Sequence, residues 1–172
     1  MSEIARRTSD LTYFSESTDQ TIGLGRVLGG LLREGDVIVL TGDLGAGKTQ
    51  LTKGIAEGMG ATDDVTSPTF TIQMIHEGTE LPLYHFDLYR LSDPDELGDA
   101  GLYDVLGGDG PCVIEWGEQF VDELGDERLD LFLTRLDDEV EPGCEPPRSL
   151  RLEPHGERAE SLARELAAAV EG

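Results

Sequence analysis

Apolar and polar residues along this chain follow two periods, one typical of strands and one typical of helices. Short apolar runs within 36–41 and 111–116 predict buried strands, and alternation within 70–75, 81–88 and 129–136 predicts further strands. Apolar residues spaced three and four apart predict helices after Ser17, over 50–57 and over 157–171. Because strands and helices follow one another in turn, the pattern favours a three-layer α/β fold.

Turn and capping residues set the boundaries of these elements. Ser17-Thr18-Asp19-Gln20 fits a capping box and predicts a helix that continues towards Gly35. The polar segment 77–80 predicts a hairpin turn, and the segment 93–96 predicts a helix start. We also expect short strands at 11–15 and 149–152, a frayed tail over 1–10 and an acidic loop over 137–147. At 172 residues, the chain is long enough for a single domain over 1–172 with a core of its own.

The glycine-rich segment 42–49 carries the most specific chemistry in the sequence. It fits the phosphate-binding loop pattern G-x-x-x-x-G-K-[ST] and stands between a predicted strand and a predicted helix. Glycines let backbone N–H groups converge on phosphate oxygens, a lysine reaches the β- and γ-phosphates, and a threonine hydroxyl can bind Mg²⁺. We therefore expect a nucleotide to contact Gly42, Asp43, Leu44, Gly45, Ala46, Gly47, Lys48, Thr49 and Gln50.

Two acidic residues follow apolar strands and are candidates to hold Mg²⁺ or its waters. Asp87 closes the run that begins at Leu83, and Glu115 closes the run that begins at Cys112. His85 alternates with Asp87, so both side chains can face one side of a strand, although a lone histidine is more often structural than catalytic.

Two further residues stand out by their rarity. Arg90 is the only Lys or Arg between Gly54 and Glu127. It can stabilise phosphate charge or hold a carboxylate, and an ordinary salt bridge is the alternative. Trp116 is the only tryptophan, and we expect it to pack in the core.

Charge and cysteine content exclude several classes of protein. With 36 acidic and 13 basic residues, the formal net charge is −23, which argues against direct, tight binding to nucleic acids or anionic membranes. Cys112 and Cys144 make no disulfide framework, so a reducing cytoplasm is the expected location. The first ten residues have no apolar signal-peptide region, and no apolar stretch approaches the ~20 residues of a membrane span.

Four motifs together resemble one family. They are the loop at 42–49, Ser-Pro-Thr-Phe at 67–70, His-Phe-Asp-Leu-Tyr-Arg-Leu at 85–91 and Ile-Glu-Trp at 114–116. In this order and spacing they resemble the bacterial TsaE (YjeE) ATPase family over about residues 11–155. That family helps to make threonylcarbamoyladenosine next to the anticodon of transfer RNAs that read codons beginning with A.

The resemblance implies a fold and a nucleotide site. The fold would be a P-loop NTPase-like sandwich with a mostly parallel central sheet and added hairpins. ATP and Mg²⁺ would be bound, with Lys48 on the phosphates, Thr49 and Glu115 at the metal, and Asp87 nearby as a second acid. A residue at the start of the first helix, Ser17 or Thr18, would lie near the nucleotide.

The resemblance also implies partners. A late basic residue, here Arg148, would approach the base, and Ser67, Pro68, Thr69 and Phe70 would form a mobile, switch-like segment. The partners would be the transferase subunit that moves the threonylcarbamoyl group and its inactive paralogue. ATP hydrolysis, weak in the free protein, would reset that complex between turnovers.

Two other functions compete with a partner-dependent ATPase. A small-molecule or nucleotide kinase of the P-loop class normally clamps an anionic acceptor with several Arg or Lys, but the middle of this chain offers only Arg90. A nucleotide-binding scaffold without turnover is the third possibility. Phosphate release, measured with and without partners, separates all three.

Overall fold

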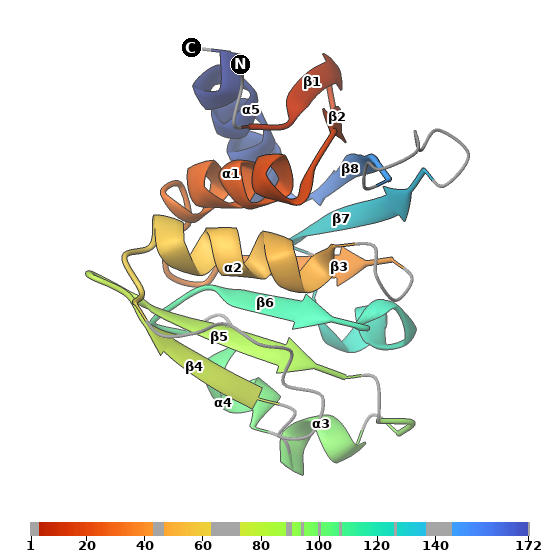
Figure 1. Ribbon diagram of the computed structural model, residues 1–172. Coiled ribbons are helices and arrows are strands. Elements are labelled where there is room, and N and C mark those ends of the chain that lie inside the picture. Colours follow the sequence, from red (N-terminus) through yellow and green to blue (C-terminus); the bar gives the residue numbers. More distant parts are fainter. Residues whose placement is uncertain are drawn as a thin grey trace.

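One mixed sheet forms the centre of the molecule. The computed structural model describes residues 4–42, 47–62, 73–88, 91–93, 95–99, 101–106, 108–125, 127–136 and 146–171. Within them, eight strands lie in the order β1-β2-β8-β7-β3-β6-β5-β4 (Figure 1). The strands are β1 (Arg6–Ser9), β2 (Thr12–Ser15), β3 (Val37–Thr41), β4 (Gln73–Glu77), β5 (Pro82–Asp87), β6 (Cys112–Glu115), β7 (Arg128–Arg135) and β8 (Arg148–His155).

The parallel part of this sheet is confined to its centre. β3 pairs in parallel with β6 and β7, and β6 pairs in parallel with β5. The pairs β1–β2, β2–β8, β7–β8 and β4–β5 are antiparallel. The expected mostly parallel central sheet with added hairpins is therefore correct for β7, β3, β6 and β5 and for the hairpin of β4 and β5, and β8, β2 and β1 extend the sheet by antiparallel pairing. Short turns, such as the one between β4 and β5, permit only antiparallel pairing.

Helices cover both faces of the sheet. α1 (Thr18–Gly29), α2 (Lys48–Gly58) and α5 (Glu157–Glu171) pack over one face, with Ile38, Leu40 and Val113 beneath them. α3 (Asp95–Asp99), α4 (Leu102–Val105) and the 3₁₀ helix η1 (Glu118–Glu123) pack over the other, against Val39 and Ile114. Because successive strand residues point to opposite faces, each central strand contributes to both cores. The predicted α/β class is confirmed.

Several predicted boundaries need correction. The tail expected over 1–10 contains β1, which pairs with β2, and the helix after Ser17 ends at Gly29 instead of continuing towards Gly35. The last strand extends to His155, well past the predicted 149–152. β1 and the end of β8 are held by backbone pairing and lack the apolar alternation on which the prediction depended. The hairpin of β4 and β5 and the helix over 157–171 are confirmed.

Four glycines bring α1 and α2 into backbone contact. A Cβ added to Gly25, Gly29, Gly54 or Gly58 would lie closer than 3.0 Å to a carbonyl oxygen of the opposite helix. The carbonyl of Ile22 faces Gly54, and further along both helices the carbonyl of Arg26 faces Gly58. The two helices therefore run in the same direction, as Figure 1 shows, and both begin at the same edge of the sheet.

Candidate nucleotide site

The carboxyl ends of the parallel strands meet at the edge where the glycine-rich segment begins. Leu40 of β3 lies beside Glu115 of β6, and Glu115 lies beside Asp87 of β5, so the two acids share one row of the sheet. β3 ends at Thr41, and α2 begins at Lys48 on the other side of the loop. Open α/β sheets bind their ligands at this carboxyl edge.

Lys48 is the buried cation of this edge. Its residue is 5% exposed, and Nζ donates a hydrogen bond to the Gly42 carbonyl oxygen at 2.5 Å. Nζ also lies 3.5 Å from the centroid of the Trp116 ring, within the range of a cation–π contact. Gly47 caps α2 with a φ of 106°, a left-handed value that favours glycine. The start of α2 thus places an ammonium near the strand ends, with a carbonyl oxygen and an aromatic face among its contacts.

The start of α1 lies beside the start of α2. Thr21 Cγ2 is 3.8 Å from the position that a Cβ on Gly47 would occupy. Ser17 caps α1 as the capping box predicts, because its Oγ accepts from the Gln20 N–H at 3.1 Å, and the Gln20 side-chain oxygen accepts from the Glu16 N–H at 2.8 Å. Thr18, predicted near the nucleotide, is the first residue of α1. Two helix N-termini, each a positive dipole end, therefore flank the loop.

Arg148 lies beside the same loop. It is the first residue of β8, opposite Ser15 of β2 and Arg135 of β7. Its Nε lies 3.8 Å from the Cβ position at Gly47, and its Nη1 donates to the Pro146 carbonyl. Arg148 is distant from Gly47 in the sequence, but the antiparallel strand β8 brings its side chain into contact distance of the phosphate-loop motif.

His85, Asp87 and Glu115 face the α2 side of the sheet. Leu83 and Val113 belong to the core beneath α1 and α2, and alternation carries the later residues of β5 and β6 to that same face. Asp87 and Glu115 are 3% and 2% exposed. His85 is fully buried, and its Nε2 lies 2.5 Å from Glu115 Oε2. The predicted alternation of His85 and Asp87 pointed to this face, although the bond to Glu115 was not expected.

Trp116 does not have its expected role. It is half-buried and belongs to neither core, so the prediction of core packing is wrong. Its φ of 60° is the only positive φ among the described residues other than glycine. Such a conformation is uncommon for a bulky residue and is often found at functional sites. This turn directly follows Glu115 and accompanies the placement of the indole over Lys48.

Comparisons with known proteins place this chain in a family. A family model described as "Threonylcarbamoyl adenosine biosynthesis protein TsaE" matches residues 15–141. The chain belongs to the TsaE family. It is 38% identical over 156 residues to a protein of Bacillus subtilis named tRNA threonylcarbamoyladenosine biosynthesis protein TsaE, covering 91% of this chain and 93% of that protein. A protein of the same name from Treponema pallidum is 44% identical, over 72% of this chain and 91% of its own.

A solved structure shares the fold of this TsaE-family chain. The crystal structure of YdiB from Bacillus subtilis superposes with a TM-score of 0.76 at 34% identity, covering 92% of this chain and 95% of that one.

The remaining predicted site residues fall into two groups. Thr49 and Gln50 follow Lys48 in the first turn of α2, where both are half-buried. Asp43, Leu44, Gly45 and Ala46, the segment Ser67 to Phe70, and Arg90 lie outside the described residues. None of the described helices combines the length and apolarity needed to cross a membrane.

The groups with clearly shifted pKa values lie away from this site. A hydrogen bond from its hydroxyl to Asp109 raises the pKa of Tyr84 to about 12, and burial raises the pKa of the Cys112 thiol to about 12. The pKa of Arg158 is raised chiefly by its bonds to Asp36. Tyr84 and Cys112 belong to the core beneath α3 and α4, on the face opposite Lys48.

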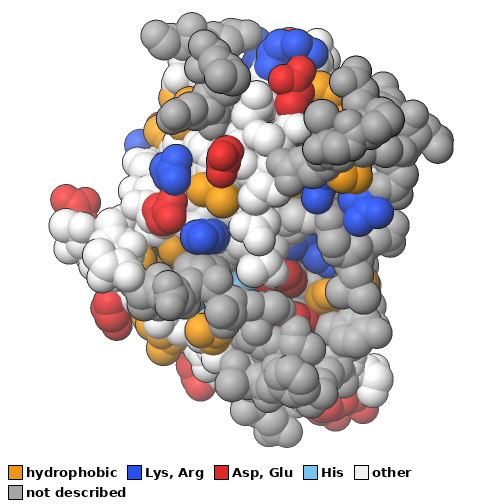
Figure 2. All heavy atoms as spheres, in the orientation of Figure 1, with side chains coloured by type: hydrophobic (Ala, Val, Ile, Leu, Met, Phe, Trp, Pro, Cys, Tyr) orange, Lys and Arg blue, Asp and Glu red, His pale blue; other side chains and the backbone are white. Residues whose placement is uncertain are grey.

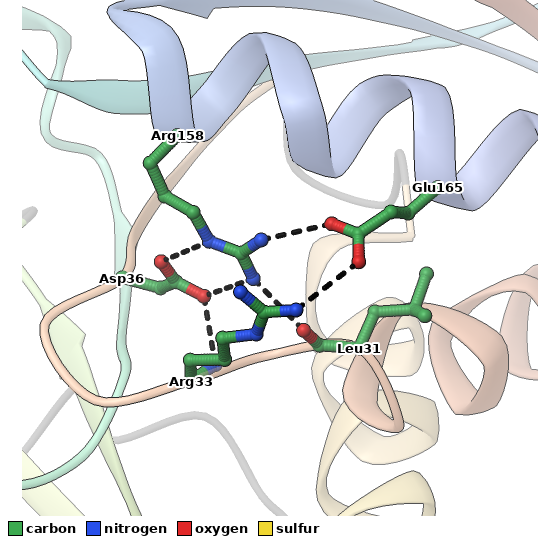
Figure 3. Close-up of polar contacts among 5 residues, drawn as sticks. All are labelled: Leu31, Arg33, Asp36, Arg158 and Glu165. Atoms are coloured by element: carbon green, nitrogen blue, oxygen red, sulfur yellow. Dashed lines mark hydrogen bonds and ion pairs between the residues drawn. The ribbon is translucent and has the colours of Figure 1, made fainter.

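Arg158 belongs to a network at the opposite, amino end of β3. Its Nε and Nη2 both lie 2.9 Å from oxygens of Asp36, its Nη1 bonds Glu165 at 2.8 Å, and Nη2 also donates to the Leu31 carbonyl at 2.9 Å (Figure 3). A cavity of about 230 Å³ lies beside it, lined also by Arg128. Because Asp36 and Asp130 already bond these arginines, the cavity offers no spare cation to an anionic ligand. The network instead fastens α5 to the sheet.

Proposed function

We propose that this chain is an ATP-binding and ATP-hydrolysing subunit of threonylcarbamoyladenosine biosynthesis on tRNA, with a P-loop NTPase fold. Relatives that are 38%, 44% and 51% identical to this chain are named after that biosynthesis. The observation that carries the proposal is the position of Lys48, at the carboxyl ends of the parallel strands, two of which end in the neighbouring carboxylates Asp87 and Glu115.

The surroundings of Gly47 suit a polyphosphate. Lys48, Arg148 and two helix N-termini provide positive potential on one side of the loop. The buried ammonium of Lys48 can make a charge-assisted hydrogen bond to an anionic phosphate oxygen, which is stronger than its bond to the neutral Gly42 carbonyl. We infer that Lys48 and the loop residues hold the phosphates of ATP, with Thr18 and Arg148 flanking the nucleotide.

The acids and Thr49 suit Mg²⁺. They offer hydroxyl and carboxylate oxygens, the donors that this ion prefers. Within the described ranges, no three His, Cys, Asp or Glu side chains are arranged to hold an ion by themselves. That fits Mg²⁺, which keeps several waters and binds through one or two carboxylates plus phosphates. We assign Thr49 and Glu115 as its ligands and Asp87 as the second acid. A bound ion would neutralise phosphate charge.

Partner binding follows from the charge of the molecule. On the face that Figure 2 shows, the visible Lys and Arg side chains lie on the half that holds β7, β8, α1 and α2, whereas the charged side chains visible on the half with β4, β5, α3 and α4 are acidic. A surface this acidic repels RNA. We therefore propose that the transferase subunit and its inactive paralogue contact the RNA, and that this chain reports its nucleotide state to them through Ser67 to Phe70.

Phosphate release decides between this proposal and its rivals. The free chain should hydrolyse ATP slowly, and the transferase subunit with its paralogue should change that rate. Lys48→Ala should abolish the signal in both conditions. Rapid transfer of phosphate to a small metabolite would support a kinase, and binding without turnover in any mixture would support a scaffold.

A further inference from the structure

We propose that His85 is a positioning residue for Glu115, holding one carboxylate oxygen so that the other is presented to the metal. This inference rests on the proposed role of Glu115 as a Mg²⁺ ligand. It starts from a single contact, His85 Nε2 to Glu115 Oε2 at 2.5 Å.

The burial of both partners gives this contact its weight. His85 is 0% exposed and Glu115 is 2% exposed. A buried polar group is costly unless it is bonded, and a buried carboxylate is more costly still. Within the described part of the chain, the bond to His85 is the only one that the Glu115 side chain makes. His85 is therefore the group that compensates Glu115 and restricts the directions it can take.

The bond also assigns different roles to the two oxygens of Glu115. As a metal ligand Glu115 would be a carboxylate, which only accepts hydrogen bonds, so in this role the His85 Nε2–H would be the donor and Oε2 the acceptor. Oε1 is left to accept from a metal or from a metal-bound water. Ligating carboxylates are commonly fixed in this way by an outer hydrogen bond, and loss of such a bond typically costs 10–100-fold in metal affinity.

The sheet explains why a histidine at this position can reach Glu115. β5 and β6 are parallel, with Asp87 beside Glu115 and His85 beside Val113. His85 and Glu115 are thus diagonal neighbours on one face, a separation that a long or aromatic side chain spans. Leu83, two residues earlier on the same face, packs in the apolar core, so packing alone would not call for a polar ring at the next position.

The test compares three variants by calorimetry. The affinity for a non-hydrolysable ATP analogue is measured over a range of Mg²⁺ concentrations. The result is the Mg²⁺ concentration at which half of the Mg²⁺-dependent gain in affinity is reached. His85→Leu removes the donor and should raise that concentration about 10-fold or more. His85→Gln keeps an N–H near the position of Nε2 and should restore much of the loss.

His155→Leu is the matched control. His155 Nε2 also lies near a buried carboxylate, 3.1 Å from Asp130 Oδ2, but at the start of β7, the opposite end of the parallel strands from Glu115. This variant should leave the Mg²⁺ dependence unchanged. Nucleotide affinity without Mg²⁺ and the melting temperature report whether each variant is folded. If His85→Leu does not fold, His85→Asn replaces it, because its shorter amide cannot reach Glu115.

Two results would overturn this inference and leave the proposed function standing. One is a His85→Leu protein with wild-type Mg²⁺ dependence, and the other is a His85→Gln protein as impaired as His85→Leu. A wild-type protein whose nucleotide affinity ignores Mg²⁺ would overturn the metal role in the proposed function as well.

Discussion

Under the proposed function, Lys48 is the residue on which nucleotide binding depends, because its ammonium is buried where α2 begins. Lys48→Ala should abolish ATP turnover and weaken ATP binding by roughly 1.5–3 kcal/mol, the worth of a charge-assisted hydrogen bond. Lys53→Ala is the matched control, because Lys53 is the only other lysine and is exposed on the same helix. Turnover assays and calorimetry measure both. Wild-type turnover in Lys48→Ala would contradict the proposed function.

Thr49 and Glu115 should act through Mg²⁺. We expect Thr49→Ala and Glu115→Ala to reduce hydrolysis far more than nucleotide binding without metal, since each removes an oxygen ligand. Thr49→Ser keeps the hydroxyl and is the control. Activity is titrated against Mg²⁺ for each variant. If Asp87→Ala abolishes the metal dependence while Glu115→Ala leaves it unchanged, the assignment of the two acids is reversed.

The emission of Trp116 should report nucleotide binding. As the only tryptophan, it accounts for all indole fluorescence, and its ring lies 3.5 Å from Lys48 Nζ. A phosphate that draws Nζ away changes the field at the ring, so ATP and ADP should alter the emission. Adenosine, which has no phosphate, is the control ligand. Emission that stays flat up to saturating ATP would mean that Lys48 keeps this contact in the bound state.

At the scale of single residues, the sequence predicted which residues lie at the site better than it predicted the contacts that they make. The motif spacing and the strand ends predicted that Lys48, Asp87 and Glu115 would meet at one edge, because parallel strands share their carboxyl end. The bond between His85 and Glu115 depends on the register of β5 against β6, which no local pattern encodes. The position of Trp116 depends on one left-handed φ, which hydropathy cannot indicate.

At the scale of elements, the contact between α1 and α2 sets where both helices begin. Gly54→Ala should lower the free energy of unfolding by about 1–3 kcal/mol, because its Cβ would meet the Ile22 carbonyl and force the backbones apart. Gly30→Ala is the control. Gly30 has a φ of −69°, and its nearest neighbour would lie 3.6 Å from the new Cβ. Urea unfolding compares the two, and equal stabilities would show that the helices separate at little cost.

Elements with a strong apolar period were predicted well, and those held by other forces were not. The helix over 157–171 has a continuous apolar side and was predicted with its true ends. The four-residue α4 and the kinked η1 are too short to show a period, and their place against the sheet comes from buried Leu102 and Phe120. The antiparallel flanks were missed in part because β1 is polar and pairs through its backbone.

For the whole molecule, charge decides what the protein can touch. The net charge is −23, and every described Lys or Arg is contributed by residues before 54 or after 127. Such a surface suits a protein partner with a basic face better than a phosphate backbone. Under the proposed function, the nucleotide state would then reach the tRNA through that partner.

A nucleotide can change the affinity of this chain for its partner only if the ATP-bound and ADP-bound forms interact with the partner differently. We therefore expect the ATP and ADP forms to bind the transferase complex with different affinities, as segments that sense the γ-phosphate do in other proteins. Calorimetry with ADP and with a non-hydrolysable ATP analogue measures this difference, and Lys48→Ala, which weakens nucleotide binding, should remove it. Equal affinities in the wild type would leave hydrolysis without a means to reset the complex. That result, together with rapid phosphate transfer to a metabolite, would favour the kinase instead.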